Sequence, residues 1–419
     1  MHSISKGRVK RILEAINAIG YTKNGMERLA FTKEEQEVKN LFTKLCLEEN
    51  MEVRVDEVGN VIARREGVRK NAPAVAIGSH LDTVYTGGQY DGVAGVVAGL
   101  EVIHRLNDYH IETEFPIEVI AFTGEESARF GISTIGSKAM CGKLPLSSLH
   151  TYKDKSGVTL TDAMQQAGLK LNDVPKAKRS QSELKAFIEL HIEQGPELEN
   201  KRKSVAIATG IAAPTRFAIS VNGMSSHSGA TSMELRNDAL VAASHLVLTV
   251  EEAARKESAS KTVATVGVLD VFPGAMNVVP GRVEFQVDIR GLNRQSKERI
   301  VEALFRSSAV LEKNRGVTIR IEKLSDEQPV LLNKEIQQML ALSCEEVSID
   351  PLSIPSGAGH DAMNMAELCP TGLMFIPSHK GISHHPLEYT SIDDLIKGIN
   401  VLEKVIRRLA MVKERNVAT

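Results

Sequence analysis

Four short runs of apolar and β-branched residues constrain the fold of this 419-residue chain more than any other feature. The runs span 72–78 (APAVAIG), 115–122 (FPIEVIAF), 186–190 (AFIEL) and 372–377 (GLMFIP). Continuous runs of this kind are typical of strands that are buried on both faces of a parallel sheet. Between the first two, apolar residues recur at helical spacing from position 93, which predicts a helix packed on that sheet. The alternation favours an α/β fold.

The segment from about 212 to 327 has a different pattern. Alternating residues predict strands, and amphipathic stretches predict helices, in the order βαββαβ of a ferredoxin-like fold. The predicted strands are 216–221, 262–271, 282–290 and 317–321, and the helices are 235–256 and 295–313. The fourth buried run, 372–377, follows this segment, so we interpret the segment as an insertion. We therefore predict an α/β domain made of residues 1–211 and 328–419, with an inserted α+β domain at 212–327.

The composition excludes several classes of protein. The net charge is −2, with both signs interspersed, so nothing indicates binding to nucleic acid or to a membrane surface. No stretch approaches the roughly 20 apolar residues of a membrane span, and the basic N-terminus is followed by no apolar signal segment. The four cysteines are scattered, without CxxC spacing. We expect a cytoplasmic protein with reduced thiols.

Side chains that bind metals follow the predicted strands or lie in Gly- or Pro-rich turns. They are His80, Asp91, Glu126, His191 and His384. In open α/β sheets, ligands bind at the carboxyl ends of the strands. Carboxylates and imidazoles together suit a pair of divalent ions that share a water. The five positions therefore predict a dinuclear site.

Three of these residues also have an ordinary structural explanation when each is taken alone. His80 suits a loop, Asp91 suits the N-cap of the helix that starts at 93, and Glu125–Glu126 suits a solvated turn. Asp82 lies two residues after His80, so its carboxylate is expected to orient the His80 ring. Adjacent residues at a strand end point in different directions, so Glu126 can bind metal while Glu125 reaches the water.

Six motifs carry a resemblance to a known family. They are GSHLDTVYTGGQYDG, AFTGEESARFGISTIGSKAM, IELHIEQGPELE, NVVPGRVEFQVDIR, PSGAGHDA and GISHHPLEYT. From about residue 26 to 405 the chain resembles the dinuclear metallo-amidohydrolases, which include N-carbamoyl-L-amino-acid hydrolases and allantoate amidohydrolases. The resemblance implies two divalent ions per subunit (Zn, Mn, Co or Ni), held by the five residues above with Asp91 bridging. It makes Glu125 the general base, and it favours His384 over His385 as the fifth ligand.

The resemblance also assigns the inserted domain a role as a dimerisation and lid domain that contacts substrate. His227 would polarise the scissile carbonyl across a homodimer, and Asn277 and Arg290 would hold the substrate carboxylate. Residues 282–290 alternate, which puts Arg290 on the open face of its strand, and a guanidinium fork matches a carboxylate. Arg216 lies where the family differs between substrate classes. Further candidate contacts near the metals are Gln194 and His360.

The predicted function is metal-dependent hydrolysis of a linear ureido or amide C–N bond in a small carboxylate substrate. The substrate would be an N-carbamoyl-L-amino acid or allantoate, and ammonia and carbon dioxide would be released. An N-acyl-amino-acid deacylase or a dipeptidase on the same scaffold is the alternative within enzymes. A non-catalytic binding protein is disfavoured because Glu125 and all five ligands are present. The sequence leaves the substrate side chain, the native metal and the pathway open.

Overall fold

The computed structural model describes residues 2–411, with side chains from Ser5 onward. The chain forms two compact units. Unit 1 comprises Met1–Thr209, Leu332–Ile354 and His360–Thr419, and unit 2 comprises Gly210–Leu331 and Pro355–Gly359. Within residues 2–411, no helix is both long and apolar enough to cross a membrane. All four cysteines lie in this range, and none forms a disulfide.

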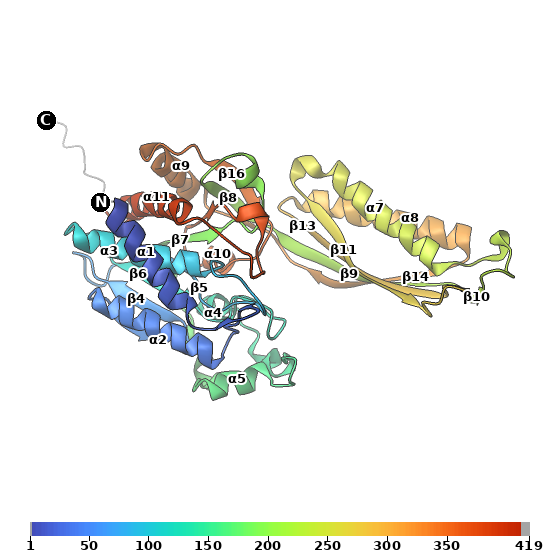
Figure 1. The fold of residues 1–419 in the computed structure, drawn as a ribbon, viewed down its shortest axis with the longest axis horizontal. Helices are drawn as coiled ribbons and strands as arrows, with labels where there is room; N and C mark the ends of the chain where they lie inside the picture. Colours follow the sequence, from blue (N-terminus) through green and yellow to red (C-terminus); the bar gives the residue numbers. More distant parts are fainter. Residues whose placement is uncertain (1, 412–419) are drawn as a thin grey trace. The chain divides into compact units, whose positions relative to one another are not determined.

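Unit 1 is built on a mixed sheet whose centre is parallel (Figure 1). Its strands include, in spatial order, β8 (Ala206–Ile211), β17 (Thr371–Ile376), β7 (Leu184–Ile192), β5 (Ala74–His80), β6 (Ile117–Phe122), β4 (Val61–Arg65) and β3 (Glu52–Val55), and β16 (Leu352–Ser356) also pairs with β8. β17, β7, β5 and β6 run parallel, whereas β8, β4 and β3 pair antiparallel. The four parallel strands overlap the four apolar runs of the sequence, which confirms the predicted α/β fold.

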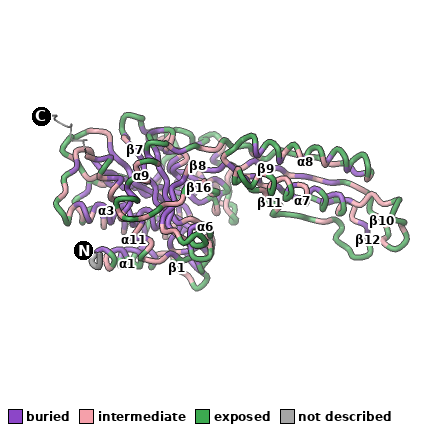
Figure 2. Tube along the Cα trace, turned by 90° about the horizontal axis from the view of Figure 1, so that it is seen from above, coloured by how far each residue is buried: buried purple, intermediate pink, exposed green. Residues whose placement is uncertain are grey.

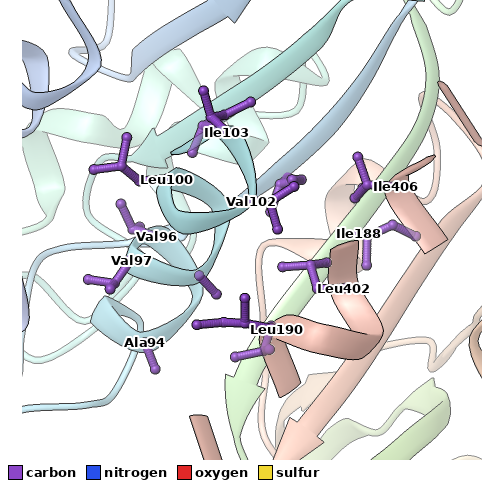
Figure 3. Packing of buried hydrophobic residues seen from close by; sticks show 14 of the residues in the cluster. Ala94, Val96, Val97, Leu100, Val102, Ile103, Ile188, Leu190, Leu402 and Ile406 are labelled. Atoms are coloured by element: carbon purple, nitrogen blue, oxygen red, sulfur yellow. The ribbon is translucent and has the colours of Figure 1, made fainter. Parts of the chain in front are cut away.

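The core of unit 1 forms where α3 (Val93–Asp108) and α11 (Ile392–Ala410) pack side by side on the sheet, with α1 (His2–Asn17) against both helices. Figure 3 shows Val102 of α3 on the side of the helix that faces Ile188 of β7 and Leu402 of α11, whereas Leu100 points to the other side. These side chains are fully buried, and burying each contributes about 1.5–3 kcal/mol. Because it is covered on several sides, α3 is apolar around most of its circumference. Figure 2 shows that the buried residues of unit 1 gather in its interior.

Several elements of unit 1 have no counterpart among the predicted ones. They are β1 (Tyr21–Thr22), β2 (Gly25–Met26), α2 (Lys33–Glu48), α4 (Ile135–Met140), η1 (Leu146–Thr151), α5 (Leu160–Gln166), η2 (Leu171–Ala177), α6 (Glu197–Asn200), α9 (Lys334–Glu346), β16 (Leu352–Ser356), α10 (Ala362–Met365) and η5 (His379–Gly381), besides α1, β3, β4, β8 and α11. Most are short, so their sequences carry little periodicity. The α4–η2 region packs on a separate small apolar cluster.

Unit 2 has the βαββαβ order predicted for the inserted segment. Its elements are β9 (Ala213–Asn222), α7 (Ala239–Lys256), β11 (Val263–Phe272), β13 (Arg282–Gly291), α8 (Arg294–Arg315) and β14 (Thr318–Asp326), with the short β10 (Ser226–His227), η3 (Met233–Leu235), η4 (Ser258–Ser260), β12 (Val278–Val279) and β15 (Val330–Leu331). The sheet order is β11–β13–β9–β14, with antiparallel pairs throughout. α7 and α8 cover one face, and the other face is open (Figure 1).

Candidate metal centre

The candidate ligands gather at the carboxyl ends of the parallel strands of unit 1. His80 is the last residue of β5, His191 is next to last in β7, and Glu126 follows β6. Asp91 precedes α3, and His384 lies on the loop after β17. The first four side chains are buried, whereas the side chain of His384 is 48% exposed. This is the edge of the sheet at which the sequence analysis predicted a metal site, because ligands bind at the carboxyl ends of the strands in open α/β sheets.

Asp91 is shared by two groups of possible ligands. His80 and His191 form one group with it, and Glu126 and His384 form the other. Asp91 Oδ1 lies 3.4 Å from His80 Nε2 and 3.1 Å from His191 Nε2. Asp91 Oδ2 lies 3.3 Å from His384 Nε2, which is 3.1 Å from Glu126 Oε1. Each carboxylate oxygen of Asp91 thus faces a separate group, as a bridging ligand does.

Backbone carbonyl groups orient both buried imidazoles. His80 Nδ1 lies 2.9 Å from the Asp82 carbonyl oxygen, and His191 Nδ1 lies 2.9 Å from the Ile192 carbonyl oxygen. A carbonyl only accepts, so each Nδ1 carries a hydrogen. Each Nε2 is therefore left to face Asp91, which is the arrangement of metal-binding histidines.

The electrostatics of the cluster also favour a cation. Hydrogen bonds with Asp91 and Glu126 raise the pKa of His384 to about 11. Burial opposes charge on His80, yet the hydrogen bond with Asp91 and the charges of nearby carboxylates raise its pKa well above the usual range. The carboxylates thus require positive charge beside the imidazoles, and this donor set fits divalent metal ions.

The Asp82 carboxylate differs from its prediction. Its Oδ1 lies 3.7 Å from His80 Nδ1, beyond hydrogen-bond distance, and the ring is held by the main-chain carbonyl instead. The carboxylate accepts the backbone N–H groups of Glu125 and Glu126, at 3.1 and 3.0 Å. The Asp82 carboxylate therefore holds the turn that carries Glu125 and Glu126, and it does not orient the His80 ring.

Glu125 and Glu126 point to different partners. Glu125 Oε2 lies 3.8 Å from His80 Nε2, whereas Glu126 Oε1 faces His384. Burial raises the pKa of Glu125 well above its usual range; the charge of His80 opposes this, and neighbouring carboxylates reinforce it. A carboxyl group in this environment keeps a proton readily once it has taken one.

Gln194 and His360 are both close to the cluster, but in different ways. Gln194 Nε2 donates to Asp91 Oδ2 at 2.7 Å and lies 3.4 Å from His384 Nε2. The His360 ring is buried and packs edge-on against the His191 ring, with centroids 4.6 Å apart. Its position favours a role in supporting His191 over the direct substrate contact that the resemblance implied.

The loop after β17 separates its two adjacent histidines. His384 has a positive φ of 55° and points to Asp91 and Glu126. Nδ1 of the neighbouring His385 accepts the Leu387 N–H at 3.1 Å, and His385 belongs to none of the possible ligand groups among the described residues. These contacts favour His384 as the fifth ligand.

Two residues beside the cluster were missed by the sequence analysis. Glu388 accepts the backbone N–H groups of Tyr90 and Asp91, and Ser383 donates to Asp91 Oδ2. The one available signal was the acidic residue four positions after His384 in HHPLE.

In unit 2, the paired strands β10 and β12 bring His227 and Asn277 together. His227 pairs with Val278, and the Asn277 carbonyl accepts the Ser228 N–H at 3.0 Å. The His227 side chain is exposed. Its Nδ1 accepts the backbone N–H groups of Gly229 and Ala230, at 3.1 and 3.2 Å. In the neutral ring Nε2 then carries the hydrogen, so His227 offers an outward-facing donor.

Arg216 and Arg290 lie on the open face of the unit 2 sheet and share Asp288. Arg290 Nη2 lies 3.0 Å and Arg216 Nε 3.4 Å from Asp288 Oδ2. Arg290 also donates to the Gly357 carbonyl oxygen at 3.0 Å. The three charged side chains line a cavity of about 400 Å³ together with Thr265. The cavity offers both donors and an acceptor to a small polar ligand.

Comparison with known proteins gives consistent matches along the whole chain. A model of peptidase family M20/M25/M40 matches residues 76–408. An uncharacterized hydrolase from Haemophilus influenzae is 45% identical over 410 residues, covering 98% of this chain and all of the relative. An N-carbamoyl-L-amino acid amidohydrolase from Geobacillus stearothermophilus is 40% identical, with coverage of 96% and 97%. An allantoate amidohydrolase from Escherichia coli is 35% identical, with coverage of 93% and 94%.

Solved structures with the same fold also match this chain over nearly its whole length. An amidase of the hydantoinase/carbamoylase family from Burkholderia multivorans superposes with a TM-score of 0.91 at 36% sequence identity. The match covers 97% of this chain and 98% of that one.

Proposed function

The chain belongs to peptidase family M20/M25/M40, and we propose that it is an amidohydrolase that cleaves a linear ureido C–N bond in a small carboxylate substrate. The amidohydrolases among its relatives are named for N-carbamoyl-L-amino acids and for allantoate. The observation that carries the proposal is the sharing of Asp91 between two ligand groups, with Glu125 buried beside them. Ammonia and carbon dioxide would be released with the remaining product.

The metal centre would contain two divalent ions, drawn from Zn, Mn, Co and Ni. His80, Asp91 and His191 would hold one, and Asp91, Glu126 and His384 the other. Bound there, the ions would supply Lewis-acid activation of water and of the scissile carbonyl. Mixed imidazole and carboxylate ligands accept all four metals, so the donor set supports the class of ion and not one element.

Glu125 and His227 would perform the proton transfer and the stabilisation of charge. Glu125 takes a proton from the attacking water and passes it to the leaving nitrogen. The position of the Glu125 carboxylate supports this role, because it is buried beside both ligand groups and its Oε2 lies 3.8 Å from His80 Nε2. The Nε2–H of His227 donates to the carbonyl oxygen as negative charge develops on it.

Arg290 would bind the substrate carboxylate with its guanidinium fork. Asp288 and Arg216 lie beside it and present an acceptor next to a donor. This pair suits a substituent with both N–H and C=O groups, such as the second ureido group of allantoate. An N-carbamoyl amino acid with an apolar side chain would use the pair less. The relative rates of hydrolysis of allantoate and of N-carbamoyl-L-amino acids would distinguish these two substrate classes.

The geometry of β13 supports a composite site in a homodimer. Arg290 lies eight residues after Arg282, which is roughly 26 Å along a strand. β10 and β12, which carry His227 and lead into Arg282, extend beyond that far end of the sheet (Figures 1 and 2). A substrate shorter than about 10 Å does not span that length. We therefore propose that Arg290 holds the substrate carboxylate in the site of its own chain, and that Asn277, with His227, serves the site of a second subunit.

The cytoplasm stays the predicted location, and the four free cysteines support it.

A substrate panel tests the function directly. Purified protein loaded with Zn, Mn, Co or Ni is assayed with allantoate, several N-carbamoyl-L-amino acids, N-acetyl-L-amino acids and dipeptides, with ammonia release and product chromatography as readouts. We expect turnover of at least one ureido substrate and loss of it with a chelator. Preference for N-acetyl substrates or dipeptides would favour the deacylase or dipeptidase alternative. Metal binding without turnover of any substrate would favour a binding protein.

A further inference from the structure

Glu388 is a buried acid between exposed neighbours in the loop after β17. It is 4% exposed, whereas its neighbours Leu387 and Tyr389 are 67% and 50% exposed. The loop is held directly after Glu388. The Tyr389 carbonyl accepts the His379 N–H at 2.8 Å, and the Thr390 hydroxyl donates to the Pro377 carbonyl oxygen at 2.9 Å. This local order turns the Glu388 side chain inward.

The Glu388 carboxylate contacts the loop that carries Asp91 in two ways. Its Oε1 accepts the backbone N–H groups of Tyr90 and Asp91, at 2.8 and 3.0 Å. Its Oε2 lies 3.1 Å from Ser383 Oγ, and that hydroxyl lies 2.7 Å from Asp91 Oδ2. Both the main chain and the side chain of Asp91 are thus tied to one carboxylate, which belongs to none of the possible ligand groups among the described residues.

The Asp91 loop is shaped around this carboxylate. A Cβ atom on Gly88 would come within 2.2 Å of Glu388 Cδ and 2.3 Å of its Oε1. Any side chain at position 88 would therefore displace the carboxylate. The loop needs such an anchor because Asp91, unlike His80 and His191, lies outside the strands and has no ladder of strand hydrogen bonds to fix its direction.

We propose that Glu388 is a positioning residue that holds Asp91 so that its two oxygens face the two separate metal groups. The proposal rests on the proposed dinuclear centre. Glu388 acts through hydrogen bonds to the Asp91 backbone, and it also contacts Ser383, whose one hydroxyl hydrogen is donated either to Glu388 Oε2 or to Asp91 Oδ2. Second-shell partners of this kind typically change metal affinity by about 10- to 100-fold when they are removed.

Four variants separate this role from a general contribution to folding. Glu388→Leu removes every acceptor, whereas Glu388→Gln keeps an oxygen for the two N–H groups and gains an amide that donates to Ser383. Ser383→Ala removes only the link to the Asp91 side chain. Glu199→Gln is the matched control, because Glu199 anchors the same loop through His379 Nδ1 and the Lys380 N–H and does not contact Asp91.

The measurement is cobalt binding by the full-length protein, followed by metal analysis after equilibrium dialysis and by the visible absorption of bound Co(II). Melting in a chelator serves as the folding control. Wild type and Glu199→Gln should bind two ions with the same spectrum. Glu388→Leu should lose at least about 10-fold in affinity for one or both ions and change the spectrum. Glu388→Gln should stay within about threefold of wild type, and Ser383→Ala should fall between.

The outcomes are distinguishable. If wild type binds fewer than two ions, the proposed dinuclear centre is wrong. If wild type binds two and Glu388→Leu binds them with unchanged affinity and spectrum, the positioning role is wrong. If Glu388→Leu does not fold, Ser383→Ala decides, and wild-type affinity and spectrum in that variant overturn the proposal. Failure of Glu388→Gln to retain the ions would also contradict it, because the geometry would have been kept.

Discussion

At the residue scale, the environment of each carboxylate in the centre determines its role. Asp82 accepts two backbone N–H groups, Asp91 faces three imidazoles and Glu126 faces His384, whereas Glu125 has no hydrogen bond to a cation among residues 5–411 and lies 3.8 Å from His80 Nε2. Glu125 is the acid that remains available for proton transfer. The difference arises from direction, since Glu125 and Glu126 are adjacent and diverge from the same turn.

Glu125→Gln should remove turnover and leave the metals bound. The amide keeps the size of the side chain but does not accept a proton, so we expect kcat to fall by about 10²–10⁴-fold. Metal analysis of the same preparation checks that two ions remain. Glu125→Asp, which keeps a shortened base, should retain more activity than the glutamine variant. Substantial turnover by Glu125→Gln would show that another group removes the proton.

Arg290→Ala should weaken the transition-state binding of a carboxylate substrate by roughly 2–5 kcal/mol, because it leaves a desolvated carboxylate unpaired. The measurement is kcat/KM for a substrate and for the same substrate with its carboxylate amidated. The amidated substrate should lose little from the mutation. An equal loss for both would mean that Arg290 acts through its contacts with Asp288 and Gly357, and not on the substrate.

Arg216→Ala provides the matched specificity test on the same face. If Arg216 pairs with a second ureido group, kcat/KM should fall for allantoate and change little for N-carbamoyl-alanine. A similar small change for both substrates would remove Arg216 from the substrate site.

At the element scale, the sequence predicted the parts of the molecule in which burial leaves a pattern. β5, β6 and β17 are buried along their whole length and β7 at every position except Lys185, and their apolar runs located the sheet edge that carries the candidate ligands. The exposed β3 and the short helices between α4 and η2 leave no such pattern. Glu388 was missed for another reason: its partner Tyr90 is 298 positions away, and only tertiary folding buries the acid.

The close packing of α3 on the sheet predicts that Gly95 does not tolerate a larger side chain. A Cβ at Gly95 would lie 2.2 Å from the Leu190 carbonyl oxygen and 2.8 Å from Ser79 Cβ, so Gly95→Ala should destabilise the protein by about 1–3 kcal/mol. Gly7 in α1 is the control, since a Cβ there meets only the flexible end of Arg11, at 3.5 Å. Gly7→Ala should stabilise by about 0.5–1 kcal/mol. Urea denaturation of both variants measures the difference, and equal stability would contradict the close approach.

At the scale of the whole molecule, the two ends of unit 2 carry different functional groups. Arg290 pairs with Pro214, close to the point where the chain enters unit 2 at Gly210, and His227 follows the opposite end of β9. The sequence placed these residues in one domain, but it did not show that a strand length separates them. If His227 and Arg290 act on the same small substrate, two chains must contribute.

Subunit mixing tests this arrangement. His227→Ala and Glu125→Ala should each be nearly inactive alone. In a mixed dimer, one site would lack both groups and the other would have both. With random re-pairing of equal amounts, half of the dimers are mixed and each has one complete site, so activity should recover to about a quarter of wild type. Native mass spectrometry confirms that subunits have exchanged. If subunits have exchanged and activity stays at background, His227 serves the site of its own chain. Because a strand length separates His227 from Arg290, only one of these two residues would then contact the substrate.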